Sequence, residues 1–384
     1  DPDNRISRGN DNINPRKLTC LNGQHLRDML VGASILLEAN VEQINALNVF
    51  PVPDGDTGTN MYLTLREIAE SVQLIGDVSA SAVAEEMAHS ALRAGRGNSG
   101  VILSQFFKGI SVGLDGLDQF GTVDWARCLR MASEYSYKAV GDPVEGTMLT
   151  VVREAADQAE NSAERSRSVA TLMDKICARA RDCVQRTPTM LPVLKQAGVV
   201  DAGGYGLFIV LEGARRKLSG GKGLSGVLRV PGSIRSRVVG QVTEEFLAHS
   251  EDELYGYCTQ FLVSGQSLNI EQIKESLEGL AKSTVVVGDP QTIKIHGHTE
   301  NPDALLGYGE SLGTLSEVSV QDMDEQKQDF SVMHREVVHD VRPIGLVAIA
   351  NGKGFRDLFT SLGVDVLVSG GDSMNPSVQE VVDG

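Results

Sequence analysis

The sequence predicts a multidomain protein in which an all-α helical domain is followed by an α+β domain and then by the start of an α/β domain. Alanine-rich amphipathic runs with small residues three or four positions apart follow one another over residues 22–218, a spacing that lets helices pack closely. Strand-like and helix-like segments alternate over residues 241–340, and an apolar strand with a glycine-rich loop after it begins a further unit over 341–384. The 384 residues fit two or three domains of ~100–200 residues each.

The helical domain is interrupted by glycine-rich segments, and each of them stands at the start of a helical run. The segments are residues 51–60, 95–100, 141–147 and 199–206, and the expected helices are 23–47, 81–95, 100–114, 124–140, 147–160 and 168–187. Because a helix N-terminus favours an anion, several such loops at one end of a helical domain can gather over one nucleotide.

The middle domain follows a Gly/Ser/basic linker at residues 219–240, a composition typical of loops. Its expected elements alternate as strand, helix, strand, strand, helix and strand, at 255–263, 270–281, 283–289, 292–299, 301–313 and 315–323. This βαββαβ order is the signature of a ferredoxin-like domain.

Both ends of the chain are expected to differ from these domains. Residues 1–21 are polar and predict a flexible leader. Residues 341–384 read as strand, loop and helix, strand, and the start of a helix, and we expect an incomplete domain because one β-α-β unit cannot cover both faces of its sheet. Loops 351–354 and 369–373 follow strands, where α/β folds place ligands, but two glycine-rich loops are weak signals.

Composition excludes several function classes. The net charge of −16, from 35 basic and 51 acidic residues, argues against nucleic acid and anionic membrane surfaces as direct partners, because both would be repelled. The five cysteines include no CxxC pair, which favours a reduced, cytoplasmic protein over a disulfide scaffold. No stretch reaches the ~18 apolar residues of a membrane span, so we expect no direct membrane insertion.

Asp54 and Asp56 form the first candidate site. Asp-Gly is a common hairpin-turn signal, but the flanking segments are helical here and a second acid follows at once. Mg²⁺ is typically held by one or two carboxylates together with substrate phosphates, and the run 57–60 then begins a helix. From spacing alone, a metal–phosphate site and an ordinary structural loop remain equally open.

Four blocks of sequence resemble two related families. "LNVFPVPDGDTGTNM", "GRGNSGVILSQFFKG", "EGTM" and "GVVDAGGYGL" resemble the ATP-binding subunit of dihydroxyacetone kinases over residues 22–218. They resemble the fatty acid kinase A-subunit family, whose members contain a DAK2 domain, over essentially the whole chain. The resemblance implies that the helical domain is an antiparallel helical barrel that binds Mg²⁺ and ATP at one end.

The resemblance also implies roles for individual residues. Asp54 and Asp56 match the metal-binding aspartates that serve catalysis, and Asn48 aligns, with a shift of one residue, with a third metal aspartate of the dihydroxyacetone kinases. The positions that match nucleotide-contacting residues are Thr57, Gly58, Thr59, Asn60, Asn98, Ser99, Thr147, Met148, Asp201, Ala202, Gly203 and Gly204. The phosphate-contacting Arg of the dihydroxyacetone kinases has no clear match, and Arg186 is the nearest candidate.

Cys258, His296 and His298 form the second candidate site. The two histidines are at i and i+2 on one expected strand and share a face, and the first and third strands of a βαββαβ sheet are usually neighbours. Cysteine with two histidines is a credible zinc set whose fourth position is open, although a buried cysteine near surface histidines is also common. The resemblance to the fatty acid kinase A-subunits implies zinc at these three residues.

The resulting hypothesis is a bacterial fatty acid kinase A subunit. It would phosphorylate a fatty acid carboxylate presented by a separate lipid-binding protein, and the resemblance also implies a homodimer. A dihydroxyacetone (glycerone) kinase subunit is the alternative enzyme, and the βαββαβ domain counts against it. A nucleotide-binding regulatory scaffold without transfer activity is the third possibility.

Overall fold

A computed structural model gives the fold of the chain. It describes residues 19–76, 78–221, 223–224, 226–228, 230, 242–243, 246–247, 254–339, 347–350, 354–355, 358–359, 362, 364 and 366–369. Most of the expected leader, more than half of the expected linker and most of the loops 351–354 and 369–373 therefore lie outside the described residues. The chain divides into two compact units, Asp1–His334 and Arg335–Gly384.

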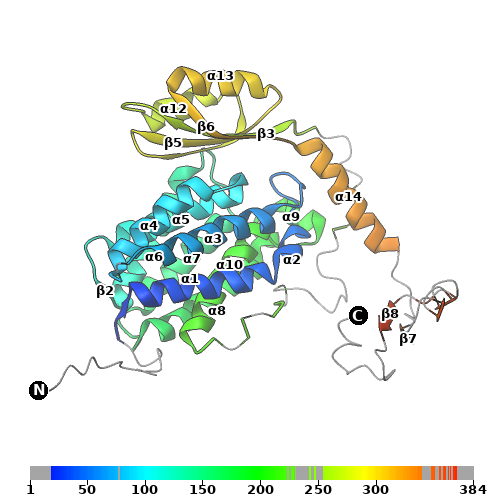
Figure 1. Cartoon of the computed structure of the whole chain (residues 1–384), viewed down its shortest axis with the longest axis horizontal. Coiled ribbons are helices and arrows are strands. Elements are labelled where there is room, and N and C mark those ends of the chain that lie inside the picture. Colours follow the sequence, from blue (N-terminus) through cyan, green and yellow to red (C-terminus); the bar gives the residue numbers. More distant parts are fainter. Residues whose placement is uncertain are drawn as a thin grey trace, which may run out of the picture. The chain divides into compact units, whose positions relative to one another are not determined.

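The part before residue 219 is mostly helical, as the sequence predicts (Figure 1). Short strands β1 (Leu21–Asn22) and β2 (Gln119–Phe120) pair with each other. The helices are α1 (Gly23–Glu38), α2 (Val41–Asn45), α3 (Thr57–Leu74), α4 (Ala80–Ala94), α5 (Gly97–Leu114), α6 (Thr122–Ala139), α7 (Met148–Ser162), α8 (Val169–Met190), α9 (Pro192–Ala197) and α10 (Ala202–Leu218). The expected single helix over 23–47 is wrong in one respect, because a turn at residues 39–40 separates α1 from α2.

The longer helices pack in a closed order. Each of α1, α3, α4, α5, α6, α7, α8 and α10 contacts the next, and α10 returns to α1. Small residues allow the closest approaches: a Cβ added to Gly109 of α5 would lie 2.3 Å from the backbone of Ala132 in α6, and one on Gly213 of α10 would lie 2.5 Å from the carbonyl oxygen of Gly32 in α1. The small-residue spacing in the sequence thus corresponds to real helix contacts.

The middle region contains a four-stranded antiparallel sheet with the expected βαββαβ order along the chain. Its elements are β3 (Tyr257–Ser264), α12 (Ile270–Leu277), β4 (Lys282–Gly288), β5 (Thr292–Thr299), α13 (Pro302–Leu312) and β6 (Thr314–Asp322). The strand order is β4-β5-β3-β6, so the first and third strands are neighbours, as expected. A helix that the sequence analysis leaves unassigned, α14 (Met323–His339), follows β6 directly.

The two faces of this sheet are buried differently. Phe261, Val263 and Ile295 pack with α12 and α13 in one apolar core. On the opposite face, Val285 and Val287 of β4 pack with residues of α5 and α6. Because side chains alternate along a strand, this second face also carries Cys258 and His296, and it contacts the helical part of the same compact unit.

In the second unit, β7 (Val347–Ala350) and β8 (Val366–Ser369) form a parallel pair. A parallel pair needs a crossover connection, which agrees with the β-α-β order expected for 341–384.

Candidate functional site

The aspartate loop, residues 46–56, joins α2 to α3 and holds Asp54 and Asp56 on either side of a glycine. Gly55 adopts φ +68°, a left-handed conformation that glycine takes without steric cost. Asn48 is buried, and its side-chain amide donates to Val52 O at 3.0 Å and also to the Asp54 carboxylate. Its carbonyl oxygen accepts from the Thr57 hydroxyl. Asn48 therefore ties the loop to the first residue of α3.

The surroundings of Asp54 and Asp56 disfavour the ionised form of both side chains. Burial raises the pKa of Asp54 well above its usual value, and the nearby charge of Asp56 raises it further. Burial also raises the pKa of Asp56, while hydrogen bonds from Asn60 and from Asp54 act in the opposite direction. Two like charges crowded in a poorly solvated place favour a proton or a cation between them. A divalent cation fits this donor set, because hard cations take carboxylate and amide oxygens.

The start of α3 is already hydrogen-bonded. The N–H groups of Gly58 and Thr59 donate to Asn45 Oδ1 at 2.8 and 3.2 Å, and the amide of Asn45 donates to the Thr59 hydroxyl. The Asn60 N–H donates to Asp56 O at 2.9 Å. Asn45, which the sequence analysis does not single out, thus caps the N-terminus that we expected to offer free donors to phosphate.

The second glycine-rich loop lies against the first. A Cβ on Gly97, where φ is +57°, would lie 2.5 Å from the side chain of Asn60, and one on Gly100 would lie 2.6 Å from the Thr64 hydroxyl. Only glycine allows this approach. Asn98 and Ser99 follow in the first turn of α5 and are half-buried.

The third and fourth loops meet at Asp201. This buried carboxylate caps α10, accepting from the Gly204 N–H at 2.6 Å, and it also accepts from the Met148 N–H at the start of α7. Burial raises the pKa of Asp201 to about 7, against these two hydrogen bonds. Thr147 caps α7 by accepting from the Leu149 N–H. Ala202 and Gly203 fill the first turn of α10 beside Met148.

The fourth loop also lies near the first. A Cβ on Gly206, in the second turn of α10, would lie 2.5 Å from the sulfur of Met61, in the second turn of α3. The starts of α3 and α5 thus form one pair, the starts of α7 and α10 form a second pair, and the approach of Gly206 to Met61 links the two. The predicted nucleotide residues therefore lie together at one end of the helical part.

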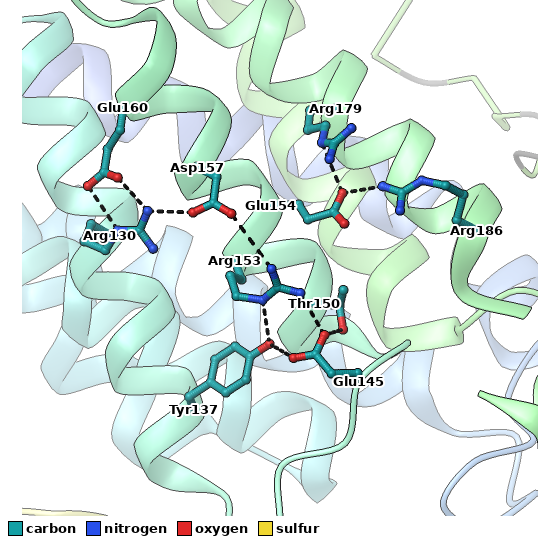
Figure 2. A network of polar contacts seen from close by, with 10 residues as sticks. All are labelled: Arg130, Tyr137, Glu145, Thr150, Arg153, Glu154, Asp157, Glu160, Arg179 and Arg186. Atoms are coloured by element: carbon teal, nitrogen blue, oxygen red, sulfur yellow. Dashed lines mark hydrogen bonds and ion pairs between the residues drawn. The ribbon is translucent and has the colours of Figure 1, made fainter. Parts of the chain in front are cut away.

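A polar network supports the turn before α7 (Figure 2). Glu145 accepts from the Tyr137 hydroxyl at 2.8 Å, from the Thr150 hydroxyl at 2.7 Å and from Arg153 at 2.8 Å. The Thr150 hydroxyl in turn accepts from the Gly146 N–H. Side chains of α6 and α7 thus hold the turn that carries Thr147 in place.

Arg186 is engaged elsewhere in the same view. Its guanidinium pairs with Glu154 at 2.5 Å, and Glu154 is shared with Arg179 (Figure 2). Arg186 also pairs with Asp182 at 3.0 Å. Both partners of Arg186 are carboxylates on α7 and α8, so its charge is already compensated within the helical part.

Cys258, His296 and His298 come together on β3 and β5. Cys258 is directly opposite His298 in the strand register, the Cys258 sulfur lies 3.8 Å from His296 Nδ1, and one ligand atom from each residue lies within 4.8 Å of the others. The expected juxtaposition of these three residues is confirmed.

The chemistry of this cluster suits a metal ion. Burial lowers the pKa of His298 to about 4 and holds that of His296 well below its usual value, so both rings are neutral and carry a lone pair. His296 Nε2 is buried and has no hydrogen-bond partner within the part of the chain that the structure describes. A buried unpaired ring nitrogen is costly, and a zinc ion, which neutral imidazole binds well, would satisfy it.

The Cys/His cluster adjoins the aspartate loop. The sequence alone does not reveal that these two sites are close together. Cys258 packs with Val52 of that loop and with Met323 of α14. Burial raises the pKa of the Cys258 thiol to about 12, and the carboxylates of Asp56 and Asp54 contribute to the rise. The two candidate metal sites are therefore close enough for their charges to interact.

Two further side chains of the same sheet face contact the second glycine-rich loop and the last turn of α4 before it. Gln260 Oε1 accepts from the Gly97 N–H at 3.2 Å, and Lys294 Nζ donates to Arg93 O at 2.8 Å. Lys294 is almost fully buried, and burial lowers its pKa to about 8. The sequence carries a signal for a polar contact here, since Lys294, His296 and His298 place three polar side chains on one face of β5, whose opposite face carries Ile293 and Ile295.

Comparisons with known proteins cover the chain from the aspartate loop onward. A DAK2 domain matches residues 51–216, a fatty acid kinase A-subunit-like middle domain matches 254–330, and a fatty acid kinase A-subunit-like C-terminal domain matches 345–384. The candidate aspartates fall in the first match and the Cys/His cluster in the second.

Relatives from two bacterial species match nearly the whole chain. Protein YloV of Bacillus subtilis (strain 168) is 35% identical over 374 residues, which cover 94% of this chain and 67% of the relative. Uncharacterized proteins of Staphylococcus aureus strains bovine RF122 / ET3-1 and USA300 are 33% and 34% identical over 385 residues, with the same coverage. Among the described residues, no helix is both long and apolar enough to cross a membrane.

Proposed function

The chain belongs to the family that joins a DAK2 domain to fatty acid kinase A-subunit-like middle and C-terminal domains, and from that premise we propose that it is an ATP-dependent phosphotransferase. Its acceptor is a fatty acid carboxylate presented by a separate lipid-binding protein, and its products are an acyl phosphate and ADP. The cofactors are Mg²⁺ and ATP at the helix starts, with zinc at the Cys/His cluster.

The observation that carries this proposal is the aspartate pair itself. Burial raises the pKa of both Asp54 and Asp56, and the charge of Asp56 raises that of Asp54 further. The side-chain amide of Asn48 donates to the Asp54 carboxylate, and its oxygen accepts from Thr57. In our proposal Asp54 and Asp56 hold Mg²⁺, which would neutralise phosphate charge when bound. The adjoining start of α5 supports a role with an anionic ligand, whereas the first N–H groups of α3 are already bonded to Asn45.

The reaction asks little acid–base chemistry of the protein. A fatty acid carboxylate has a pKa of ~4–5 and is already ionised at neutral pH, so no general base is needed. A carboxylate oxygen attacks the γ-phosphorus, the bond from phosphorus to the β–γ bridging oxygen breaks, and ADP leaves with that electron pair. The protein contributes alignment and charge compensation, for which loops fixed by Asn48, Asn45 and Asp201 are suited.

In the same proposal Cys258, His296 and His298 hold zinc. Two observations support it: His296 Nε2 has no hydrogen-bond partner among the described residues, and the three ligand atoms lie within 4.8 Å of one another. The three residues would leave a fourth position for water or another ligand, as in open zinc sites.

A separate carrier for the lipid agrees with the packing of the helical part. The apolar cavity enclosed by α1, α4, α5, α6, α8 and α10 measures about 30 Å³ and is lined by side chains such as Leu26, Phe106 and Trp125. Ligand pockets usually hold ~300–1,000 Å³, so an acyl chain does not fit there. The homodimer, like the cytoplasmic location, stays a prediction.

Measuring ADP formation with two acceptors and one lipid-free control tests this function. The purified chain with Mg²⁺ and ATP should release ADP when a fatty-acid-loaded lipid-binding protein is added, and not with the same carrier free of lipid. Turnover with dihydroxyacetone instead would favour the glycerone kinase alternative. Nucleotide binding with no turnover on any acceptor would favour a regulatory scaffold.

A further inference from the structure

Helix α14 carries a buried stripe that runs along the aspartate loop. Met323, Lys327, Phe330 and His334 follow one another at spacings of four, three and four residues, so they lie on one face of the helix. All four are buried, whereas Val332 on the other side of the helix is 55% exposed. A helix that only connected two domains would not need such a face.

Three residues of this stripe contact the aspartate loop. Met323 packs with Val52. A Cβ on Gly55, between the two aspartates, would lie 3.0 Å from Cδ2 of the Phe330 ring. His334 Nε2 lies 3.0 Å from Ala46 O, a carbonyl that accepts a hydrogen bond. These contacts span the loop from its first residue to the aspartate pair.

The two aromatic side chains also support each other. The Phe330 and His334 rings are 4.0 Å apart between centroids, and His334 Nδ1 lies 2.9 Å from Phe330 O. Phe330 belongs to the core of the helical part, although it lies more than a hundred residues after that part ends. The Phe330 ring thus packs against the aspartate loop at Gly55, whose φ is positive.

We propose that Phe330 and His334 are positioning residues for the aspartate pair. The Phe330 ring packs behind Gly55, and His334, in the tautomer with the proton on Nε2, donates to Ala46 O. Together they hold the loop so that Asp54 and Asp56 keep the separation needed for a divalent cation and nucleotide phosphate. The inference rests on the proposed function, because it assigns the two side chains to the same cation site.

Plain core packing is the competing explanation, and it makes a different prediction. A residue that only fills the core changes the free energy of unfolding when truncated and leaves the cation dependence of the folded protein alone. A positioning residue changes that dependence in protein that is still folded. Groups that orient metal ligands typically alter metal affinity or activity by about 10–100-fold.

The experiment uses the full chain with Phe330→Ala, Phe330→Leu, His334→Ala and His334→Gln, and Val332→Ala as the control on the exposed face. Mn²⁺ binding in the presence of ADP is followed by electron paramagnetic resonance, and thermal unfolding is measured in parallel. Phe330→Ala and His334→Ala should weaken Mn²⁺ binding about tenfold or more. Phe330→Leu, which keeps apolar bulk, and His334→Gln, which keeps a donor near Ala46 O, should recover most of it.

Two alanine variants are made so that the result does not depend on the folding of a single variant. If Phe330→Ala does not fold, His334→Ala, which leaves the Phe330 ring in the core, still decides the question. Folded variants with the wild-type Mn²⁺ affinity would overturn the inference. The wild type itself separates the two proposals: if it binds Mn²⁺ with ADP but transfers no phosphate, the proposed function fails while the positioning role is still measured.

Discussion

Cys258 of β3 packs against Val52, two residues before Asp54 in the aspartate loop. The candidate zinc ligands and the candidate magnesium ligands come from different domain matches, yet they lie side by side in one compact unit. The charges of Asp54 and Asp56 already act on the Cys258 thiol. Each candidate metal site is therefore part of the other's electrostatic surroundings.

Replacing either aspartate by asparagine should have opposite effects on activity and on stability. Asp54→Asn and Asp56→Asn should lower phosphoryl transfer by about a hundredfold or more, because charge compensation at phosphate is lost. Without divalent cations, the same variants should melt at or above the wild-type temperature at pH 8, since the raised pKa means that ionised carboxylates destabilise the folded state. Turnover assays and thermal melts check this.

The control for that prediction is Asp115→Asn, which changes an exposed acid in the connection after α5. It should leave turnover and melting unchanged. Asparagine variants at Asp54 and Asp56 with normal Mg²⁺-dependent turnover would show that the aspartate loop is only structural.

Metal analysis tests the Cys/His cluster. The chain purified without chelator should hold close to one zinc per molecule, and the His296→Ala/His298→Ala double variant should hold none. His89→Ala, which changes an exposed histidine of α4, should keep the metal. A wild-type chain that contains no metal and melts at the same temperature with and without chelator would exclude zinc at this cluster.

Asp201 gives a prediction about pH. Its pKa rises from 3.8 to about 7 on folding, so between about pH 4 and pH 7 the folded chain holds a proton that the unfolded chain has released. This contribution to stability is present at low pH and is lost as pH rises towards 7. Asp201→Asn keeps a helix cap but does not titrate.

The melting temperature of Asp201→Asn, relative to wild type, should therefore increase from pH 4 to pH 7 by a few degrees and then level off. Calorimetry over this range measures it. A difference that stays constant with pH would mean that Asp201 remains ionised in the folded chain.

Removing residues 343–384 should leave nucleotide binding intact. The candidate nucleotide loops all precede residue 219, and the described contacts of α14 with the aspartate loop come from Met323, Phe330 and His334. A chain ending at residue 342 should bind Mg²⁺ and ADP within about twofold of the wild-type affinity, as measured by titration calorimetry. A large loss of affinity would show that the last region completes the site.

Local patterns in the sequence predict most of the helices before residue 219 and the strands of the middle sheet. The histidine pair can be placed beside Cys258 because strand alternation and the βαββαβ order are local rules. What the sequence does not reveal are contacts between distant segments. Gln260 on Gly97, Phe330 behind Gly55 and Cys258 beside Val52 depend on how the second face of the sheet and α14 pack against the helical part.

Asn45 escapes prediction for a related reason. An asparagine at the end of a short helix usually caps its own chain, and nothing local shows that it accepts from Gly58 and Thr59. The helix α14 escapes prediction because its apolar residues are few, and its buried face includes Lys327 and His334, which a hydrophobic pattern does not count.

The most direct test of the central claim is the chemical identity of the product. The chain is incubated with Mg²⁺, ATP and a fatty-acid-loaded lipid-binding protein in the presence of hydroxylamine, which converts an acyl phosphate into a stable hydroxamate. We expect one fatty acyl hydroxamate for each ADP formed, and neither product with Asp54→Asn. ADP formation without hydroxamate, or equal hydroxamate from the Asp54→Asn variant, would contradict phosphoryl transfer to a carboxylate at this aspartate pair.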